Sequence, residues 1–247
     1  MTTILGAAAS ALSHYERVMD VTAHNLANVN TAGFKRSRAM SEGAPATGVA
    51  AGQGRLGVGQ TSIDLIVRTG PALLSENHLS FAIQDDAFMR VTGFDGTVLF
   101  TRFGQLDVDS ARNVVDFRGR FLLPPIHIPE GTTNPSVDAS GNVVVIDSAG
   151  KSVVAGRLSV ARFVNPQGLE ALGDGVYRES LNSGAIQVGE AGDTNFAPFI
   201  PMALEGSNVE ISEEFTTMIL AQRAYQASAR TFKIGDEMLE ASTNLTR

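Results

Sequence analysis

The two ends of the chain share one pattern of apolar positions. Apolar or small residues recur at alternating spacings of three and four over residues 5–29, and the same spacing returns over residues 211–243. This heptad spacing places them on one narrow stripe of a helix, which another helix must cover. The stripes consist of Leu5, Ala8, Leu12, Tyr15, Met19, Thr22, Leu26 and Val29 at the first end, and of Ile211, Phe215, Met218, Gln222, Tyr225, Ala229, Phe232, Asp236, Leu239 and Thr243 at the second.

Local signals set the expected bounds of both helices. The first helix is predicted from about Thr2 to Asn28, because the Asn, Thr and Gly residues that follow favour a turn. Ser207 and Glu210 have the spacing of a capping box, which predicts that the last helix starts there and runs to about residue 244. Gly235 lies inside this helix at a cost of about 1 kcal/mol relative to Ala, which indicates a bend or a close helix contact.

The middle of the chain has a different pattern. Residues 61–201 contain short apolar runs separated by turn signals such as Asp95-Gly96, which is typical of a tight hairpin. We expect an all-β domain of barrel or sandwich type. Residues 41–60 contain six glycines and no regular period, which predicts a flexible connection or an irregular hairpin.

The predicted fold class is therefore α+β, with long terminal helices in a coiled-coil-like assembly domain and a central all-β domain. Residues 1–40 and 204–247 are expected to form the two halves of the assembly domain. Residues 41–60 are expected to connect the first half to a β domain at 61–203.

Composition narrows the possible functions. A net charge of −7 disfavours nucleic-acid binding, because neutralising phosphates requires a basic surface. The basic run Lys35-Arg36-Ser37-Arg38 is interpreted as a solvated helix end. The absence of cysteine excludes disulfides and thiolate metal sites. No apolar run approaches the length of a membrane span, so no membrane insertion is expected. Residues 4–12 have no basic residue before them and continue into the heptad pattern, so we expect no cleaved signal peptide.

No arrangement of residues indicates catalysis. His14, His24, His78 and His127 have no metal-ligand spacing, and the chain contains no G-x-S-x-G, H-E-x-x-H or P-loop motif. The glycines of residues 52–57 match G-x-G-x-x-G, but no convincing strand precedes them and no helix follows. We predict no catalytic residues, no cofactor and no metal.

Several longer strings resemble the flagellar axial proteins, which are the rod and hook subunits of the bacterial flagellum. The most specific are residues 25–35, 204–210, 218–225 and 236–239. Weaker ones lie inside the chain at Phe100-Thr101-Arg102, Leu122-Leu123-Pro124 and residues 168–173. The resemblance covers nearly the whole chain. It implies a structural subunit of the flagellar rod, most like the distal-rod protein, with a proximal-rod subunit or a short hook-type protein as alternatives.

The resemblance also implies partners and a location. Subunits would self-associate through their terminal helices into a tube, with other rod subunits, the hook protein and the basal-body rings as partners. They would reach the basal body through the flagellum's own type III export channel. The residues expected at the assembly interface, from these strings and the helix stripes, are Leu5, Leu12, Met19, Asn25, Leu26, Asn28, Gly33, Phe34, Ser207, Asn208, Val209, Phe215, Met218, Gln222, Arg223, Tyr225, Phe232 and Leu239.

Two alternatives stay open at this point. Gln222 and Asp236 either fix the register between subunits or lie at the edge of the stripe. A different class of function, a secreted β-domain binding or adhesion module, would need exposed aromatic residues. The chain has no Trp and only 6% aromatic residues, which disfavours that class.

Overall fold

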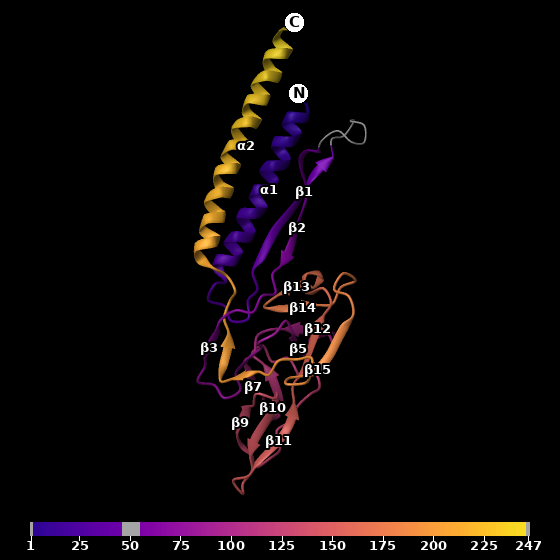
Figure 1. Ribbon diagram of the computed structural model, residues 1–247, viewed down its shortest axis with the longest axis vertical. Coiled ribbons are helices and arrows are strands. Elements are labelled where there is room, and N and C mark those ends of the chain that lie inside the picture. The colour runs from indigo at the N-terminus through magenta and orange to yellow at the C-terminus, as the bar shows by residue number, and fades with distance from the viewer. Residues whose placement is uncertain (1, 46–54, 246–247) are drawn as a thin grey trace. The chain divides into compact units, whose positions relative to one another are not determined.

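The computed structural model describes residues 2–45 and 55–245 of the chain (Figure 1). The described residues form two compact units. One, the helical unit, is built from residues within 1–28, 37–64 and 209–247. The other, the β unit, is built from residues 29–36 and 65–208. The chain passes from one unit to the other four times.

The helical unit contains the two long helices predicted from the heptad pattern, α1 (Thr2–Ala27) and α2 (Ile211–Leu245). They lie side by side and run antiparallel, with both chain ends at the same end of the pair (Figure 1). At this end, a Cβ placed on Gly235 would lie 2.9 Å from Leu5 Cδ2. The predicted close helix contact at Gly235 is therefore confirmed. Helices at both termini and a mostly β remainder confirm the α+β class.

The predicted start of the second helix is wrong. The helix α2 begins at Ile211, and the carbonyl of Glu210 accepts its first helical hydrogen bond, from the N–H of Glu214 at 3.1 Å. Ser207 is buried four residues earlier, in the β unit, and so it is not the N-cap. The capping-box spacing is outweighed because the β unit holds residues 205–208 in a non-helical conformation.

The helical unit also contains a hairpin. Strands β1 (Ser37–Pro45) and β2 (Arg55–Leu65) form a two-stranded sheet, and β1 contacts α1. Of the two structures expected for residues 41–60, the described parts therefore form a hairpin. Residues 46–54, and with them part of the glycine pattern at 52–57, lie outside the described residues.

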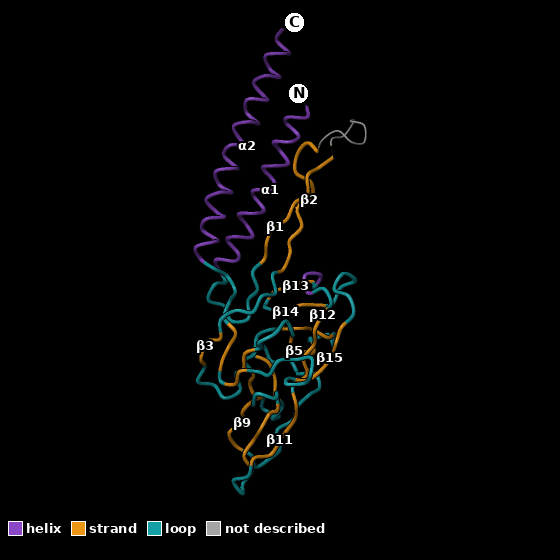
Figure 2. The backbone as a smooth tube through the Cα atoms, in the orientation of Figure 1, coloured by secondary structure: helices purple, strands orange, loops and turns teal. Residues whose placement is uncertain are grey.

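The β unit is built from short antiparallel strands (Figure 2). Its largest sheet has the order β13-β14-β6-β5-β12-β15, with strands Glu170–Gly173, Val176–Arg178, Val98–Thr101, Phe88–Thr92, Ser159–Phe163 and Ile186–Glu190. A three-stranded sheet has the order β11-β10-β9, with strands Ser152–Arg157, Asn142–Ile146 and Thr133–Val137.

Three strand pairs complete the β unit. They are β16 (Ile200–Pro201) with β4 (Phe81–Ala82), β17 (Ala203–Glu205) with β3 (Ala72–Leu74), and β7 (Leu106–Val108) with β8 (Val114–Asp116). A single-turn 3-10 helix, Pro166–Gly168, follows β12.

Both faces of the six-stranded sheet are buried at its central strands. Alternate side chains of a strand point to opposite faces, and neighbouring residues of the central strands accordingly belong to different apolar clusters. Met89 and Leu99 belong to the larger cluster, whereas Phe88 and Phe100 belong to an aromatic cluster in which Phe100 and Phe163 meet edge to face. The β unit therefore has a well-packed core of its own.

One turn type recurs four times in the β unit. In each five-residue turn, the first residue is Asp, its carbonyl accepts the N–H of the fourth residue, and its N–H donates to the carbonyl of the fifth. The fourth residue has a positive φ in every case, which favours glycine. The turns span residues 109–113, 116–120, 138–142 and 147–151.

The sequence predicted the Asp95-Gly96 hairpin, which lies between β5 and β6, and Gly96 has a φ of 81°. The turn at residues 109–113 was missed because Arg112 stands where the others have glycine, with a φ of 62°. The Arg112 guanidinium donates to the carbonyls of Ile128 and Pro129, which helps to stabilise this conformation.

Candidate assembly site

Small residues form the contact between the two helices. Ala221 is only 3% exposed, and Gly235 is also buried. A shallow groove of about 370 Å³ lies between the helices, lined by Ile4, Ala7, Ala8, Ala11, Ala227, Ser228 and Thr231. Small side chains allow two helix backbones to approach closely, so the most buried positions of α2 include Ala221 and Gly235 and none of its large apolar residues.

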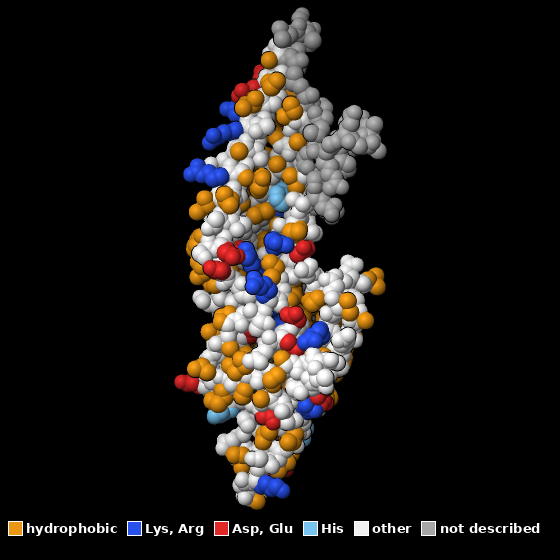
Figure 3. All heavy atoms as spheres, in the orientation of Figure 1, with side chains coloured by type: hydrophobic (Ala, Val, Ile, Leu, Met, Phe, Trp, Pro, Cys, Tyr) orange, Lys and Arg blue, Asp and Glu red, His pale blue; other side chains and the backbone are white. Residues whose placement is uncertain are grey.

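The stripe predicted on α2 lies elsewhere on the helix surface. At 3.6 residues per turn it is rotated by roughly a quarter turn from the buried face that includes Glu214 and Ala221. Phe215 is 49% exposed, and Ile211, Tyr225 and Phe232 are exposed as well. Gln222, Arg223, Ala229 and Asp236 are also exposed, while Met218 and Leu239 are half-buried. Hydrophobic side chains are visible along the outer surface of the helices (Figure 3).

The stripe on α1 is more covered. Leu5, Leu12, Met19 and Leu26 are half-buried, and Ala8 and Thr22 are buried. Within the chain, the predicted α1 stripe is therefore mostly half-buried or buried, whereas most of the α2 stripe is exposed. Whether either stripe contacts other subunits stays a prediction.

A polar face of α1 holds the hairpin. Ser10, His14 and Arg17 recur at helical spacing, so they lie on one face. Ser10 Oγ accepts the N–H of Val58 at 3.1 Å, His14 Nδ1 lies 3.1 Å from Thr61 Oγ1, and Arg17 donates to the Thr61 carbonyl at 3.3 Å. Burial lowers the pKa of His14. His14 therefore lies at the contact between α1 and the hairpin.

Asn25, at the end of α1, binds two other segments of the helical unit. Its Nδ2 donates to the Ser37 carbonyl at 2.8 Å and to Glu214 Oε2 at 3.1 Å, and its Oδ1 accepts the Ser37 N–H at 3.0 Å. Asn25 is only 1% exposed. This motif residue therefore ties α1, the start of β1 and the first turn of α2 together.

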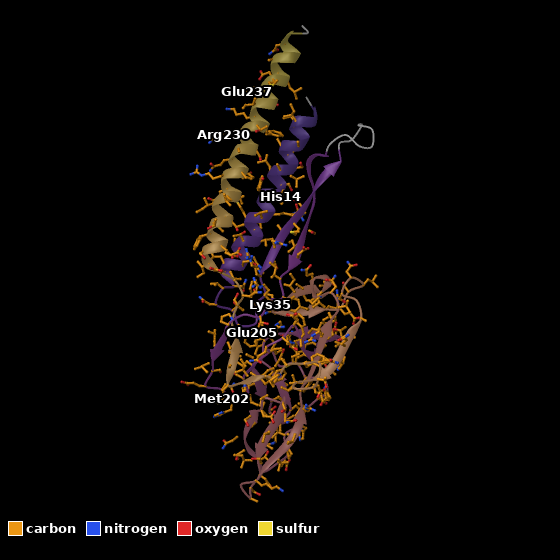
Figure 4. All side chains as sticks on the ribbon, viewed as in Figure 1. His14, Lys35, Met202, Glu205, Arg230 and Glu237 are labelled. Atoms are coloured by element: carbon orange, nitrogen blue, oxygen red, sulfur yellow. The ribbon has the colours of Figure 1, made fainter. Side chains whose placement is uncertain are left out.

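A buried charge cluster lies in the β unit where the motif strings meet. Lys35 Nζ is 2.6 Å from Glu205 Oε1, and Arg102 Nε is 2.8 Å from Glu205 Oε2. All three side chains are 0–1% exposed. Figure 4 shows Lys35 and Glu205 next to each other. Lys35 also donates to the Arg68 carbonyl, and the Gly70 N–H donates to Glu205 Oε1. One carboxylate therefore joins residues that are up to 170 positions apart.

Burial shifts the pKa of Lys35, a member of the cluster, and that of Tyr177. Burial, together with the nearby Arg102 guanidinium, lowers the pKa of Lys35 to about 8 despite the opposing effect of Glu205. Burial raises the pKa of Tyr177 to about 12. Both shifts arise because removing a charged form from water is costly.

Asn208 bonds to backbone groups of the same unit. Its Oδ1 accepts the Arg36 N–H at 2.7 Å, and its Nδ2 donates to the carbonyls of Ile66 and Arg68 at 2.8 and 2.9 Å. Nearby, Gly33 has a φ of 69°, and a Cβ there would lie 3.0 Å from Phe103 N, which only glycine avoids. Asn208 and Gly33 therefore have structural contacts within the chain.

The other candidate residues have less specific positions. Asn28 follows α1 and its side chain donates to the His24 carbonyl, Phe34 is half-buried in the turn after α1, and Val209 is buried just before α2. Among the residues missed as sites, Lys35, Arg102 and Glu205 all lie in the quoted strings. Their signal was that each is a charged residue within a string that carries the resemblance, but only the fold shows that they meet.

Residues 2–45 and 55–245 contain no group of three or more His, Asp or Glu residues that could hold a metal ion. In the same part of the chain, no helix is both long and apolar enough to cross a bilayer.

Three protein-family models match the chain. Residues 5–35 match the model "Flagella basal body rod protein", residues 82–145 match "Flagellar hook protein FlgE/F/G D1 domain", and residues 201–245 match "Flagellar basal body rod FlgEFG protein C-terminal". These matches include Asn25, Lys35, Arg102, Glu205 and Asn208, the residues of the two networks described above.

Characterised relatives extend this similarity over the full length. The flagellar basal-body rod protein FlgG of Bacillus subtilis is 33% identical over 256 residues, covering 96% of this chain and 97% of the relative. The FlgG of Borreliella burgdorferi is 34% identical over 268 residues, covering all of both chains. The flagellar hook protein FlgE of Borreliella burgdorferi is 37% identical over 112 residues, covering 45% of this chain and 25% of the hook protein.

Proposed function

The chain belongs to the flagellar basal-body rod protein family, and on this premise we propose that it is a distal-rod subunit that polymerises through its two terminal helices. Membership makes it a structural protein of the flagellar basal body and not an enzyme. The family also implies assembly with other rod and hook subunits. Family membership also argues against the alternative of a secreted β-domain binding or adhesion module.

The exposed apolar stripe of α2 carries the proposal for polymerisation. Large apolar residues such as Phe215 and Phe232 remain 40–49% exposed, while small residues make the contact with α1. Burying apolar surface yields about 25 cal/mol per Å², so a helix face of this kind is stabilised by a partner. We propose that helices of neighbouring copies cover it through the predicted interface residues, in heterologous contacts that do not close into a ring.

The distal position and the remaining partners are part of the same proposal. The relatives that align over nearly the whole chain are FlgG proteins, whereas the hook protein aligns over less than half of it. The proposed partners are the other rod subunits, the hook protein at the distal end and the basal-body rings around the rod. The proposed route is export through the flagellum's own channel, without a cleaved signal.

A pair of substitutions on α2 tests polymerisation. We expect Phe215→Glu to abolish rod assembly while the purified monomer keeps its melting temperature, because the side chain is exposed within the chain and the charge falls in the proposed subunit contact. The matched control is Thr216→Glu, which adds the same charge at a neighbouring exposed position off the stripe. The readouts are motility of a rod-deficient strain and the protein content of purified basal bodies.

Normal assembly of Phe215→Glu would overturn the assignment of the stripe. Equal loss with both variants would show that the added charge acts without regard to the stripe, which also contradicts the proposal. Imaging of a labelled subunit in purified basal bodies distinguishes the distal rod from the proximal rod.

A further inference from the structure

The helix α2 carries a further exposed surface on the side away from α1. Arg223 and Arg230 follow the buried Ala221 by two and nine residues, so at 3.6 residues per turn both lie about half a turn from the contact with α1. Both arginines are exposed, and on the same side Ile219 and Ile234 are 56% and 57% exposed. Figure 4 shows Arg230 on the side of α2 away from α1. We call these two arginines and two isoleucines the basic face.

The helix α1 carries an exposed surface of the opposite charge. Glu16 and Asp20 are exposed and four residues apart, so they are neighbours on one side of the helix. Three alanines, Ala9, Ala23 and Ala27, are exposed on the same side. We call these five residues the acidic face. The polar residues that hold the hairpin lie on a different side of α1.

The two faces are complementary in shape as well as in charge. A helix face that meets only water normally carries polar residues, but the basic face has two isoleucines that are more than half exposed. The acidic face has alanines around its two carboxylates, which allow another helix to approach closely. Large apolar side chains on one face therefore match small ones on the other.

The charges of both faces are available for a partner. Within residues 2–45 and 55–245, none of these two carboxylates and two guanidiniums forms an ion pair, whereas Lys233 and Glu237 on the same helix α2 lie 3.9 Å apart. The two arginines are about 10 Å apart along the helix axis and the two carboxylates about 6 Å apart. Arginine has a long side chain and binds carboxylates with two parallel hydrogen bonds, so both pairs can form together.

We propose that the basic face of one copy of the chain binds the acidic face of the next copy. The contact rests on the proposed function as a rod subunit, and it adds a defined charge pairing to the apolar stripe of α2. A second copy is the partner because one chain carries both faces and their charges are complementary. The faces lie on different helices, so a copy that binds one neighbour through α2 still offers α1 to another, and the contact repeats without closing.

Analytical ultracentrifugation of the purified full-length chain tests this contact outside the rod. The basic-face variant is Arg223→Glu/Arg230→Glu, and the acidic-face variant is Glu16→Arg/Asp20→Arg. Each variant carries the same charge on both faces, so we expect each alone to self-associate at least about tenfold more weakly than wild type. In an equimolar mixture the faces are again complementary, and association should return to within about threefold of wild type.

Two controls exclude a general effect of charge. Each reversal changes the net charge of −7 by four and leaves both variants negative, so recovery in the mixture does not arise from overall attraction. Arg118→Glu/Lys151→Glu makes the same change as the basic-face variant at exposed positions of the β unit, and should associate like wild type. Added salt should weaken the association of the wild-type chain, because exposed charges are screened, and this tests the contact without any substitution.

The proposal is overturned if the wild-type chain stays monomeric up to its solubility limit, if either face variant associates like wild type, or if the mixture does not recover. In a rod-deficient strain, either variant alone should be missing from purified basal bodies, and co-expression of both should restore the rod. Failure of co-expression to restore it would overturn the contact in the rod. If the wild-type chain itself fails to complement, the proposed function fails, whereas ultracentrifugation still decides the contact.

Discussion

The helical unit and the β unit differ in the kinds of side chain that they bury. The β unit buries an aromatic cluster and several charged side chains, among them Lys35, Arg102 and Glu205, which form ion pairs with one another. The helical unit packs through alanine and glycine and leaves Phe215 and Phe232 exposed. The comparison teaches that the β unit has a core of large apolar side chains, whereas the two helices meet largely through small residues and leave much of one apolar stripe exposed.

We expect the largest loss of stability when the buried carboxylate of Glu205 is neutralised. Glu205→Gln leaves Lys35 and Arg102 buried without a counter-charge, and breaking a buried ion pair in this way costs about 3–5 kcal/mol. Urea unfolding of the monomer, monitored by the circular dichroism signal of β structure, measures this loss in the free energy of unfolding. The control Asp174→Asn removes a carboxylate from the exposed pair with Arg118, so it should cost about 0–1 kcal/mol. Equal losses would contradict the assigned role of the cluster.

The pKa shifts of Lys35 and Tyr177 predict that the free energy of unfolding rises and then falls as the pH is raised above 8. The pKa of Lys35 is about 8 in the fold, below its ordinary value, so between pH 8 and 10 the unfolded chain binds more protons and stability rises. The pKa of Tyr177 is about 12, above its ordinary value, so above pH 10 the unfolded chain loses its proton first and stability falls.

Each limb has a slope of up to about 1.4 kcal/mol per pH unit. The free energy of unfolding, measured by urea titration at each pH, checks both limbs. Lys35→Met should abolish the rise and keep the fall, and Tyr177→Phe should do the opposite. A rise that persists in Lys35→Met would have to come from another group, and the assignment would be wrong.

Overpacking the contact between α1 and α2 should destabilise the helical unit alone. Ala221→Leu inserts a large side chain at a position that is 3% exposed, which costs about 1–3 kcal/mol. Amide exchange should accelerate in α1 and α2 and stay unchanged in β5 and β6. The control Ala229→Leu, at an exposed position of the same helix, should leave both units unchanged. If Ala221→Leu has no effect, the small-residue contact does not hold the helices together.

The smallest effect tests the corrected start of α2. A true N-cap serine contributes about 1 kcal/mol to its helix, but Ser207 lies in the β unit four residues before Ile211. Ser207→Ala should therefore leave exchange in the first turn of α2 unchanged, while the β unit loses about 1 kcal/mol or less. Fraying confined to that first turn would restore Ser207 as the cap.

The outcome for Ser207 shows why some local signals failed. The Asp95-Gly96 turn and the two long helices depend on interactions between residues close in sequence, so their positions were predictable. The start of α2 depends on residues 205–208 being held by strand β3 and by backbone groups of residues 36 and 66–68. A local capping preference of about 1 kcal/mol does not outweigh several long-range hydrogen bonds.

The candidate site divides in the same way. The motif strings drew attention to Asn25 and Asn208, but nothing in a linear pattern reveals that they bind consecutive peptide groups. The heptad spacing placed apolar residues on one face of α2 but did not specify which face meets α1. That choice depends on how closely two backbones can approach, which Ala221 and Gly235 decide in three dimensions.

The sequence by itself therefore determined the α+β class, the two terminal helices, the hairpin turns with glycine and the resemblance that the relatives bear out. Each of these is encoded in short-range periodicity, in backbone preferences or in contiguous strings. Only the tertiary structure decided the rotation of α2, the start of that helix and the meeting of Lys35 with Glu205 across 170 positions. The physical reason is that a buried charge or a close backbone contact is stabilised by what surrounds it, and its surroundings come from segments that no local pattern links.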